Sequence, residues 1–453
     1  MSPTPELRAV VFDIGDTLVR AAAPGTPVDH LRAVPIGRAV PHLRALAGRF
    51  RLAAVTDTAV MTGPDVRAAL AGTGLDELLE VIVTSHDVGV AKPDPRGLRQ
   101  ALDALGVAPH QALMVGDSPV DRGAADAAGI AFEPPDPVRG PGEAVRRHLA
   151  RAVGPAAAAL ALVGPLDDAS AAAADRHQAQ LTKPPGSLGR VEDLGSRLAA
   201  MAGACPPPVP SPAAVAVFAG DHGVLAEGVT HWPQEVTGQM VANFVAGGAA
   251  VNVLARQVGA SVTVVDVGVA ADLDALGLAG APGLRRANVS AGTANLAAGP
   301  AMSPAEVRAA LDVGAAVADD LIAGGARCLV TGEMGIGNTT PAAALIAAFT
   351  GRPPADVTGR GTGVDDATLA TKVKVVERAV ARLDDDADPI TVLAEVGGLE
   401  IAALAGYVVG GASHGVPVVV DGVIALAGLL AASAMCPAVT GYVVAGHRST
   451  EPG

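Results

Sequence analysis

Residues 327–349, RCLVTGEMGIGNTTPAAALIAAF, have the pattern of a strand, a glycine-rich loop and a helix. Three loop glycines and three residues at the expected start of the helix define it: Gly332, Gly335, Gly337, Asn338, Thr339 and Thr340. Because glycine has no side chain, several backbone N–H groups can face one anion, and the start of the helix adds partial positive charge. The segment therefore predicts a phosphate-binding loop, with a tight strand–helix connection as the alternative. No GK[ST] sequence follows, so it is not a Walker A loop.

The same alternation of strands and helices extends from about Pro165 to the end of the chain. Its strand candidates are residues 214–219, 261–267, 328–331 and 417–420, separated by Ala-rich helical segments. This alternation predicts a parallel sheet. The most apolar run, residues 416–439, is interrupted by Pro417, Asp421 and Pro437, so we expect a buried strand and a helix rather than a membrane span.

The first 132 residues have a similar alternation. Strands are expected at residues 9–12, 52–56, 80–84 and 112–115, with a helix at 94–105. Residues 133–164 are rich in Pro, Gly and Ala, which indicates a linker. We therefore predict an α/β protein with two parallel-sheet domains, residues 1–132 and 165–453, joined by the linker 133–164.

Composition narrows the possible function classes. The chain has 453 residues, of which 50% are apolar and 17% are charged, and this excludes a disordered chain. Its net charge is −14, and it lacks the runs of Lys and Arg that are typical of nucleic-acid-binding proteins. Cys205, Cys328 and Cys436 lie far apart, which fits a reducing cytosol, and no signal peptide is recognisable. We therefore expect a cytoplasmic protein with neither nucleic-acid nor membrane partners.

Chemically active side chains follow the predicted strands of the first domain. Asp13 follows the first strand, Thr56 ends the second, Asp117 follows the fourth with Asp121 shortly after it, and Lys92 lies between the second and third of these positions. The carboxyl ends of parallel strands meet at one edge of a sheet, so these groups should share a crevice. There, two acids can hold Mg²⁺, a carboxylate can attack a phosphoryl group, and Lys92 and Thr56 can stabilise anionic oxygens.

In this order, these motifs resemble the haloacid dehalogenase-like hydrolase superfamily over about residues 8–132. The resemblance implies that Asp13 is a nucleophile and that Thr56 and Lys92 contact phosphate. It also implies that Asp13 and Asp117 hold Mg²⁺, so a phosphatase would be a second activity of the chain.

One position departs from that superfamily. Its phosphatases carry an aspartate two residues after the nucleophile as general acid, whereas this chain has Gly15 there, followed by Asp16. General acid catalysis contributes roughly 10²–10⁴-fold, so we expect a weak phosphatase. The segments between Thr17 and Thr56 and between Thr56 and Lys92 are too short for a cap domain, so the site should be open to bulky substrates. A degenerate domain kept for packing or dimerisation is the alternative.

Further motifs of the second domain accompany the glycine loop. They are QLTKPPGSLGRVEDL (180–194), FAGDHGVLAEGVTHWPQEVTGQMVANFVAGGAAVNVLARQ (218–257), GTANLAAGPAM (292–302), VTGRGTGVDDATLATK (357–372), LAEVGGLEIAALAG (393–406) and AGHRSTEPG (445–453). In this order and spacing, residues 165–453 resemble the nicotinate-nucleotide–dimethylbenzimidazole phosphoribosyltransferase family. The resemblance implies a Rossmann-like parallel sheet with a smaller helical part, a homodimer and no cofactor.

That family transfers phosphoribose from nicotinate mononucleotide to 5,6-dimethylbenzimidazole, which gives alpha-ribazole 5'-phosphate and nicotinate in the nucleotide-loop branch of cobalamin biosynthesis. The resemblance implies that the glycine loop holds the phosphate and that Glu333 contacts the ribose or stabilises positive charge. Thr230 and Gln239 match the family's benzimidazole-contacting segment. Asp421 is a further inward-facing candidate for the base, or else a buried and paired acid.

Two residues of the second domain keep two interpretations each. His222 is a site residue or a hydrogen-bonded structural histidine, and Trp232 is a wall for a flat ligand or a packing residue. Family members continue past the sequence GHRS-x-EPG into a tail with a Gly-Glu-Gly segment, whose glutamate is the proposed base for the benzimidazole nitrogen. No residue here matches that glutamate. The resemblance therefore implies a truncated chain, a proton taken by Glu333 or by solvent, or weak activity.

Three functions remain open on the sequence. The first is phosphoribosyl transfer with a weak phosphatase in the first domain, whose open site would admit the phosphate monoester that the transferase makes. The second is a catalytically impaired binding or scaffold protein. The third is a phosphatase with an inert partner domain.

Overall fold

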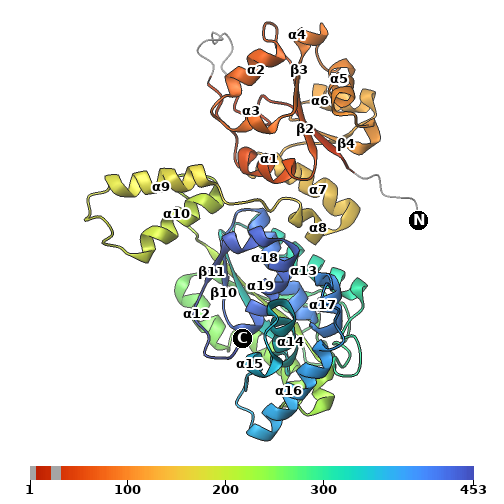
Figure 1. The fold of residues 1–453 in the computed structure, drawn as a ribbon, viewed down its shortest axis with the longest axis vertical. Coiled ribbons are helices and arrows are strands. Elements are labelled where there is room, and N and C mark those ends of the chain that lie inside the picture. The colour runs from red at the N-terminus through yellow and green to blue at the C-terminus, as the bar shows by residue number, and fades with distance from the viewer. Residues whose placement is uncertain (1–6, 22–31) are drawn as a thin grey trace. The chain divides into compact units, whose positions relative to one another are not determined.

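The computed structural model describes residues 7–21 and 32–453, which divide into two compact units, Met1–Cys205 and Pro206–Gly453 (Figure 1). Each unit is built around its own sheet, and the strand pairs in both sheets are parallel. The predicted α/β class with two Rossmann-like parallel sheets is confirmed. Part of the short segment between Thr17 and Thr56 lies outside the described residues.

The first unit contains a five-stranded sheet of order β3-β2-β1-β4-β5. Its strands are β1 Ala9–Phe12, β2 Arg51–Thr56, β3 Val81–Thr84, β4 Ala112–Val115 and β5 Ala131–Glu133. Alternate residues of β1 face opposite sides, so Val10 and Phe12 join one apolar cluster and Ala9 and Val11 join the other. Burial on both faces explains why this strand is apolar throughout.

The first unit has helices on both faces of this sheet. They are α1 Ala39–Ala47, α2 Gly63–Leu70, α3 Leu75–Leu78, α4 Ser85–Val88, α5 Arg96–Leu105, α6 Pro119–Ala128, α7 Gly142–Val153, α8 Pro155–Leu160, α9 Asp168–Gln180 and α10 Arg190–Ala202. The last two, α9 and α10, pair with each other as a hairpin that extends away from the sheet (Figure 1). The four predicted strands and the predicted helix are confirmed with small shifts at their ends.

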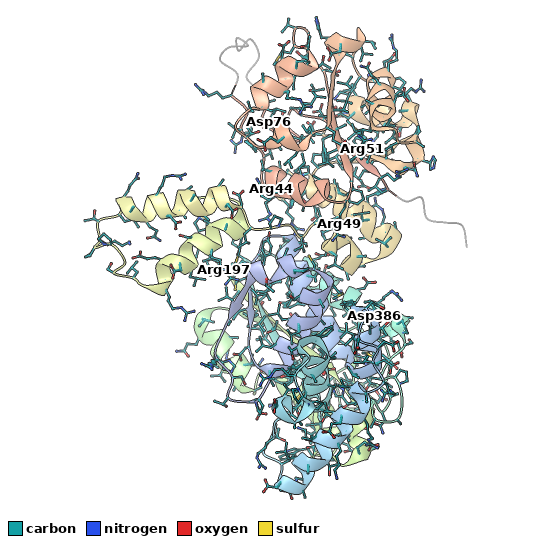
Figure 2. All side chains as sticks on the ribbon, in the orientation of Figure 1. Arg44, Arg49, Arg51, Asp76, Arg197 and Asp386 are labelled. Atoms are coloured by element: carbon teal, nitrogen blue, oxygen red, sulfur yellow. The ribbon has the colours of Figure 1, made fainter. Side chains whose placement is uncertain are left out.

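The predicted linker, residues 133–164, is largely helical. It contains α7 and α8, and its side chains Val145, Leu149 and Leu162 belong to the same apolar core as β1. The next helix, α9, is tied to the same unit, because Asp167 caps it and also pairs with Arg44 of α1 at 2.9 Å (Figure 2). An Ala-rich composition reflects helices that pack closely here, so the first compact unit extends well beyond residue 132.

The second unit contains a six-stranded sheet of order β11-β10-β9-β6-β7-β8. Its strands are β6 Ala213–Gly220, β7 Ser261–Gly268, β8 Leu284–Arg286, β9 Cys328–Met334, β10 Val418–Val420 and β11 Val443–Ala445. Its helices are α11 Glu235–Val245, α12 Ala250–Val258, α13 Pro304–Ala323, α14 Thr339–Thr350, α15 Pro354–Val357, α16 Asp366–Val380, α17 Pro389–Val396, α18 Leu399–Ser413 and α19 Val423–Met435. The apolar run 416–439 forms β10 and α19, as expected.

Glycines allow two helices of this unit to pack at unusually short range. Helix α18 is buried along its whole length and lies against α13. A Cβ atom at Gly314 would lie 1.8 Å from the carbonyl oxygen of Ala403, and one at Gly406 would lie 2.0 Å from that of Leu311. The contact therefore fixes α18 beneath the sheet.

The stretch formed by α11 and α12, Glu235–Val258, is the helical segment of the described residues with the length and hydropathy of a membrane span. Residues 246–249 break it into two helices.

Candidate active sites

The first candidate site lies at the carboxyl edge of the first sheet. β1 and β4 are neighbours in register, with Phe12 opposite Val115, so Asp13 and Asp117 leave the sheet at the same edge. Lys92 reaches this edge and its Nζ lies 2.5 Å from Asp13 Oδ1. The structure thus brings together the residues that the sequence placed in one crevice.

Lys92 is held by a third carboxylate, that of Asp121. Its Nζ donates to Asp121 Oδ1 at 2.5 Å and to the carbonyl oxygen of Val55 at 3.3 Å. Asp121 also accepts from Ser118 in a capping box at the start of α6. The sequence Ser-x-x-Asp before a helix signals such a cap, but its contact with Lys92 needed the fold.

Burial shapes the charges of this cluster. Burial raises the pKa of Asp13 to about 6, although the neighbouring Lys92 ammonium lowers it. Burial disfavours the charged form of Lys92, but Asp13 and Asp121 raise its pKa above the ordinary value. The ammonium is therefore held charged between two carboxylates.

Three carboxylates could hold a metal ion at this edge. Oxygen atoms of Asp13, Asp117 and Asp121 lie within 4.8 Å of one another. Asp117 is exposed and also accepts from Thr17 Oγ1 at 3.3 Å. Carboxylate oxygens are the ligands that Mg²⁺ prefers, and it keeps several waters, so this donor set fits it. Thr56 lies partly buried at the end of β2, and its hydroxyl forms no hydrogen bond within the described residues.

The residues after Asp13 form a turn, in which the position two residues on is Gly15. Asp16 has a positive φ of 53°, and its Oδ1 accepts from the backbone N–H of Ala21 at 3.0 Å. This hydrogen bond holds the Asp16 carboxylate within the turn, so Asp16 does not supply the acid that the hydrolase resemblance places at position 15. Among the described residues, a Cβ atom at Gly15 would meet Ala21 Cβ at 3.9 Å, an ordinary van der Waals contact.

The second candidate site is the glycine loop between β9 and α14. Gly335 packs so closely that a Cβ atom there would lie 2.3 Å from the carbonyl oxygen of Gly220, and Gly337 has a φ of +89°. Gly332 lies inside β9, opposite Val217, and is therefore a strand residue rather than part of the loop. The strand continues through Met334, three residues beyond the prediction.

The loop leaves backbone donors free where the helix begins. Ile336 donates to Thr237 Oγ1 at 3.2 Å, and Asn338 and Thr340 donate to loop carbonyl oxygens. The N–H groups of Gly337 and Thr339 donate no hydrogen bond within the described part of the chain. Two unpaired donors at the N-terminus of a 12-residue helix are an anion-binding arrangement. The side chain of Thr340 is fully buried, so it faces away from the loop's surface.

A second glycine loop, residues 359–363, is connected to the first through Lys372. Lys372 is buried, and its Nζ donates to Thr339 Oγ1 and to the carbonyl oxygen of Gly359, both at 2.9 Å. Burial lowers its pKa, and Glu451 opposes this effect. Glu451 also accepts from the N–H of Gly361 at 3.3 Å. Lys372 is the last residue of the motif at 357–372, but only the fold places its ammonium beneath the loop.

Glu333 occupies the centre of the sheet beside the first loop. Its Oε2 accepts from Asn338 Nδ2 at 2.6 Å. Burial, reinforced by the nearby Glu400 carboxylate, raises the pKa of Glu333 to about 7. A carboxyl group with this pKa can exchange a proton near neutral pH.

A buried ion pair lies next to Glu333. His222 Nε2 and Glu400 Oε1 are 2.9 Å apart, and neither side chain is exposed. Burial opposes the charged ring, but Glu400 raises the pKa of His222. A Cβ atom at Gly398 would lie 2.6 Å from the ring, so the glycine makes room for the pair. His222 is therefore hydrogen-bonded, and Glu400 is a partner that sequence reasoning missed.

The predicted benzimidazole contacts lie on and before α11. Thr230 is partly buried, and its hydroxyl accepts from the N–H of Trp232, whose residue is 53% exposed. Gln239 is exposed on α11, the helix whose Thr237 binds the glycine loop. This helix therefore connects the predicted benzimidazole segment to the predicted phosphate loop.

Asp421 follows β10 and is neither inward-facing nor buried. Its side chain is 61% exposed and pairs with His447 Nδ1. The strand ends at Val420, so the next residue already projects into solvent.

Two family models match the chain, and one of these matches begins inside the first compact unit and extends through all of the second unit. Residues 163–453 match a model described as phosphoribosyltransferase, and residues 27–129 match one described as haloacid dehalogenase-like hydrolase. The hydrolase match begins after Asp13, so the position of that residue rests on the geometry described above.

Curated and solved relatives match the same C-terminal region. A nicotinate-nucleotide–dimethylbenzimidazole phosphoribosyltransferase from Salinispora tropica is 59% identical over 303 residues, which are 65% of this chain and 83% of that protein. One from Chloroflexus aggregans is 52% identical over 292 residues, 64% of this chain and 81% of that protein. The crystal structure of CobT from Thermus thermophilus has a TM-score of 0.61 and 49% identity, and the match covers 63% of this chain and 84% of that one.

Proposed function

The chain belongs to the nicotinate-nucleotide–dimethylbenzimidazole phosphoribosyltransferase family, and we propose from this premise that residues 163–453 perform that reaction, with the candidate site in the second unit. It transfers phosphoribose from nicotinate mononucleotide to 5,6-dimethylbenzimidazole and gives alpha-ribazole 5'-phosphate and nicotinate. The reaction belongs to the assembly of the lower ligand of cobalamin.

The observation that carries this proposal is the pair of unpaired N–H groups at Gly337 and Thr339. They lie at the start of α14, and Lys372 lies next to Thr339. A 5'-phosphate bound there receives backbone hydrogen bonds, the helix charge and a nearby ammonium. Such an anchor holds the ribose at a fixed distance from the carboxyl edge of β9, where Glu333 lies.

The chemical step needs charge stabilisation and a proton acceptor. The bond between C1 and the nicotinate nitrogen breaks with its electron pair on nicotinate, and a benzimidazole nitrogen attacks C1 from the opposite face. Ionised Glu333 stabilises the positive charge at C1. The second benzimidazole nitrogen then loses its proton, and we assign Glu333 or solvent as the acceptor because Glu333 has a pKa of about 7.

We assign the flat base to the segment before and within α11. Thr230 and Gln239 offer polar groups, and the exposed Trp232 offers an aromatic surface for stacking. Asp421 is a weaker candidate for this role, because His447 already pairs with its carboxylate.

The test is nicotinate release from a mixture of nicotinate mononucleotide and dimethylbenzimidazole. Release supports the transferase, and calorimetric binding of the nucleotide without release supports the alternative of an impaired binding protein. No binding of the nucleotide contradicts the proposal, because the loop is then not its phosphate site.

We also propose a cytoplasmic homodimer for this unit. One face of α12 exposes Val253, Leu254 and Val258, which a second copy would cover. Light scattering measures the mass of the particle, and a monomer at micromolar concentration would contradict this assignment.

For the first unit we propose a weak phosphatase, because Asp13 lies within reach of Lys92 and of a cation-binding set of carboxylates. Asp13 attacks the phosphorus atom, and Lys92 and Thr56 stabilise the phosphoryl oxygens. Mg²⁺, held by Asp13 and Asp117, would neutralise phosphoryl charge. Phosphate release by the wild-type chain that is lost in Asp13→Asn tests this function.

A further inference from the structure

We propose that the site of the first unit acts on acyl and aryl phosphates, whose leaving groups depart without a proton, and discriminates against alkyl phosphates. The inference rests on the proposed phosphatase function and names the substrate class of that same site. It follows from the hydrogen bonds that engage the proton donors around Asp13.

The ammonium of Lys92 has no spare N–H group. Its three donors are directed at Asp13 Oδ1, Asp121 Oδ1 and the carbonyl oxygen of Val55. An ammonium held in this way stabilises negative charge, but it does not deliver a proton to a departing oxygen.

The neighbouring hydroxyl groups are also engaged. Thr17 donates to Asp117, and Ser118 donates to Asp121. Thr56 keeps an unengaged hydroxyl at the end of β2, but an aliphatic alcohol is too weak an acid to protonate a leaving group.

The described residues directly after Asp13 provide no free carboxylic acid. Position 15 is glycine, whose nearest described neighbour for a Cβ atom is Ala21 Cβ at 3.9 Å, and the carboxylate of Asp16 is bound to the N–H of Ala21. Within the described residues, the carboxylates of the cluster are those of Asp13, Asp117 and Asp121. These three serve as nucleophile, cation ligands or partners of Lys92. A fourth carboxylate at this edge, that of Asp57 beside Thr56, accepts from the backbone N–H of Lys92 at 3.1 Å.

The first step can therefore be written without proton transfer. A carboxylate oxygen of Asp13 forms a bond to phosphorus, and the bond from phosphorus to the leaving oxygen breaks with its electron pair on that oxygen. The products are an aspartyl phosphate and a free carboxylate or phenolate. The rate then depends on how well the leaving group carries negative charge.

Leaving groups differ widely in this respect. Carboxylic acids ionise near pKa 4 and phenols near pKa 10, whereas an alcohol, like water, is a far weaker acid than either. An alkyl phosphate needs a proton on its departing oxygen, and a missing general acid costs roughly 10²–10⁴-fold. Acyl and aryl phosphates escape most of this loss.

The second step suffers from the same missing group. Water attacks the phosphorus of the aspartyl phosphate, releases the Asp13 carboxylate and loses a proton to the surrounding water. The acid of the first step would have been the base here, so its absence slows hydrolysis. We therefore expect the phosphorylated chain to accumulate.

The experiment compares three probes on the full chain with Mg²⁺: acetyl phosphate, 4-nitrophenyl phosphate and glycerol 3-phosphate. We expect the first two to react at least about 100-fold faster than the third, after subtraction of spontaneous hydrolysis. Intact-mass and peptide analysis should find one phosphoryl group on Asp13 with acetyl phosphate, and none in Asp13→Asn.

Gly15→Asp supplies the missing acid, and Gly15→Ala is its matched control, because it fills the same space without a titratable group. We expect Gly15→Asp to raise glycerol 3-phosphate hydrolysis by roughly 10²–10⁴-fold and acetyl phosphate hydrolysis by less than about tenfold. Gly15→Ala should raise neither, and circular dichroism checks that both variants fold.

The outcomes separate this inference from the function on which it rests. Equal wild-type rates for acetyl and glycerol phosphates would overturn the substrate preference and leave the phosphatase standing. No phosphoryl group on Asp13 and no phosphate release from any probe, in the wild type and in Gly15→Asp alike, would overturn the phosphatase itself.

Discussion

At the scale of single residues, the second site depends on charges that the fold buries. Glu333 has its pKa raised to about 7, mainly by burial, so the folded chain binds its proton more tightly than the unfolded chain does. The free energy of unfolding should therefore fall as pH rises from about 4.5 to about 7, and remain lower above that range.

Glu333→Gln removes this dependence. We expect the variant to be more stable than the wild type at pH 8, by about 1–3 kcal/mol, and little changed at pH 4.5. Calorimetric unfolding at the two pH values measures it, with Glu395→Gln, a partly buried acid on α17, as control. Equal stabilisation at both pH values would contradict a raised pKa.

The same carboxyl group sets the expected pH profile of the reaction. If ionised Glu333 is the active form, nicotinate release rises with pH through about 7 in the wild type. In Glu333→Gln the rate should be lower and should not follow this rise. Initial rates between pH 5.5 and 8.5 check it, and an identical profile in the variant would exclude Glu333 as proton acceptor.

The position of Lys372 beside the predicted phosphate loop could not be predicted from the sequence. Its ammonium is buried beside Thr339, and we expect Lys372→Met to raise the KM for nicotinate mononucleotide by about 10–100-fold with a smaller effect on kcat. Lys374→Met, an exposed lysine on the same helix, is the control and should change neither constant. An unchanged KM in Lys372→Met would move the phosphate elsewhere.

At the scale of elements, long apolar segments were predictable and short edge strands were not. β1, β4 and β6 are buried on both faces, so their residues are apolar at successive positions and form a continuous run that the sequence shows. β5, β8 and β11 have three residues each and lie at sheet edges, where one partner strand defines them and no clear run marks them. Residues 133–164, predicted as a linker, contain the helices α7 and α8, because an Ala-rich composition suits packed helices as well as linkers.

The contact between α13 and α18 gives a prediction at this scale. Gly406→Ala places a methyl group 2.0 Å from a carbonyl oxygen that a rigid helix cannot move, so we expect a loss of about 1–3 kcal/mol or more in the free energy of unfolding. Gly299→Ala, where a Cβ atom meets nothing within 4 Å, should be nearly neutral. Denaturant unfolding compares the two, and similar stabilities would mean that the helices separate easily.

At the scale of the whole molecule, the chain carries two separate cores. The first surrounds a five-stranded sheet and the second a six-stranded sheet, and each unit has its own candidate site. The family resemblance of both halves could be predicted from the sequence, because the order and spacing of motifs are visible in the sequence itself. The pairing of His222 with Glu400 and of Lys372 with Thr339 could not be predicted, since these residues lie far apart along the chain.

Separate cores predict separate melting. We expect two calorimetric transitions, of which Leu52→Ala lowers only the one belonging to the first unit, by about 2–5 kcal/mol in unfolding free energy, because Leu52 is buried in that core. Gly406→Ala should lower only the other. A single transition that both variants shift together would show that the units unfold as one.

The hydroxyl of Thr237 ties the helix assigned to the flat base to the N–H of Ile336 in the loop assigned to the phosphate. Through this hydrogen bond, a ligand bound at the loop can therefore affect the helix, and a ligand bound at the helix can affect the loop. We therefore expect ordered binding: the heterocycle should bind with higher affinity after the nucleotide has bound and made the phosphate loop more rigid. Without the nucleotide, the protein should bind the same heterocycle only weakly.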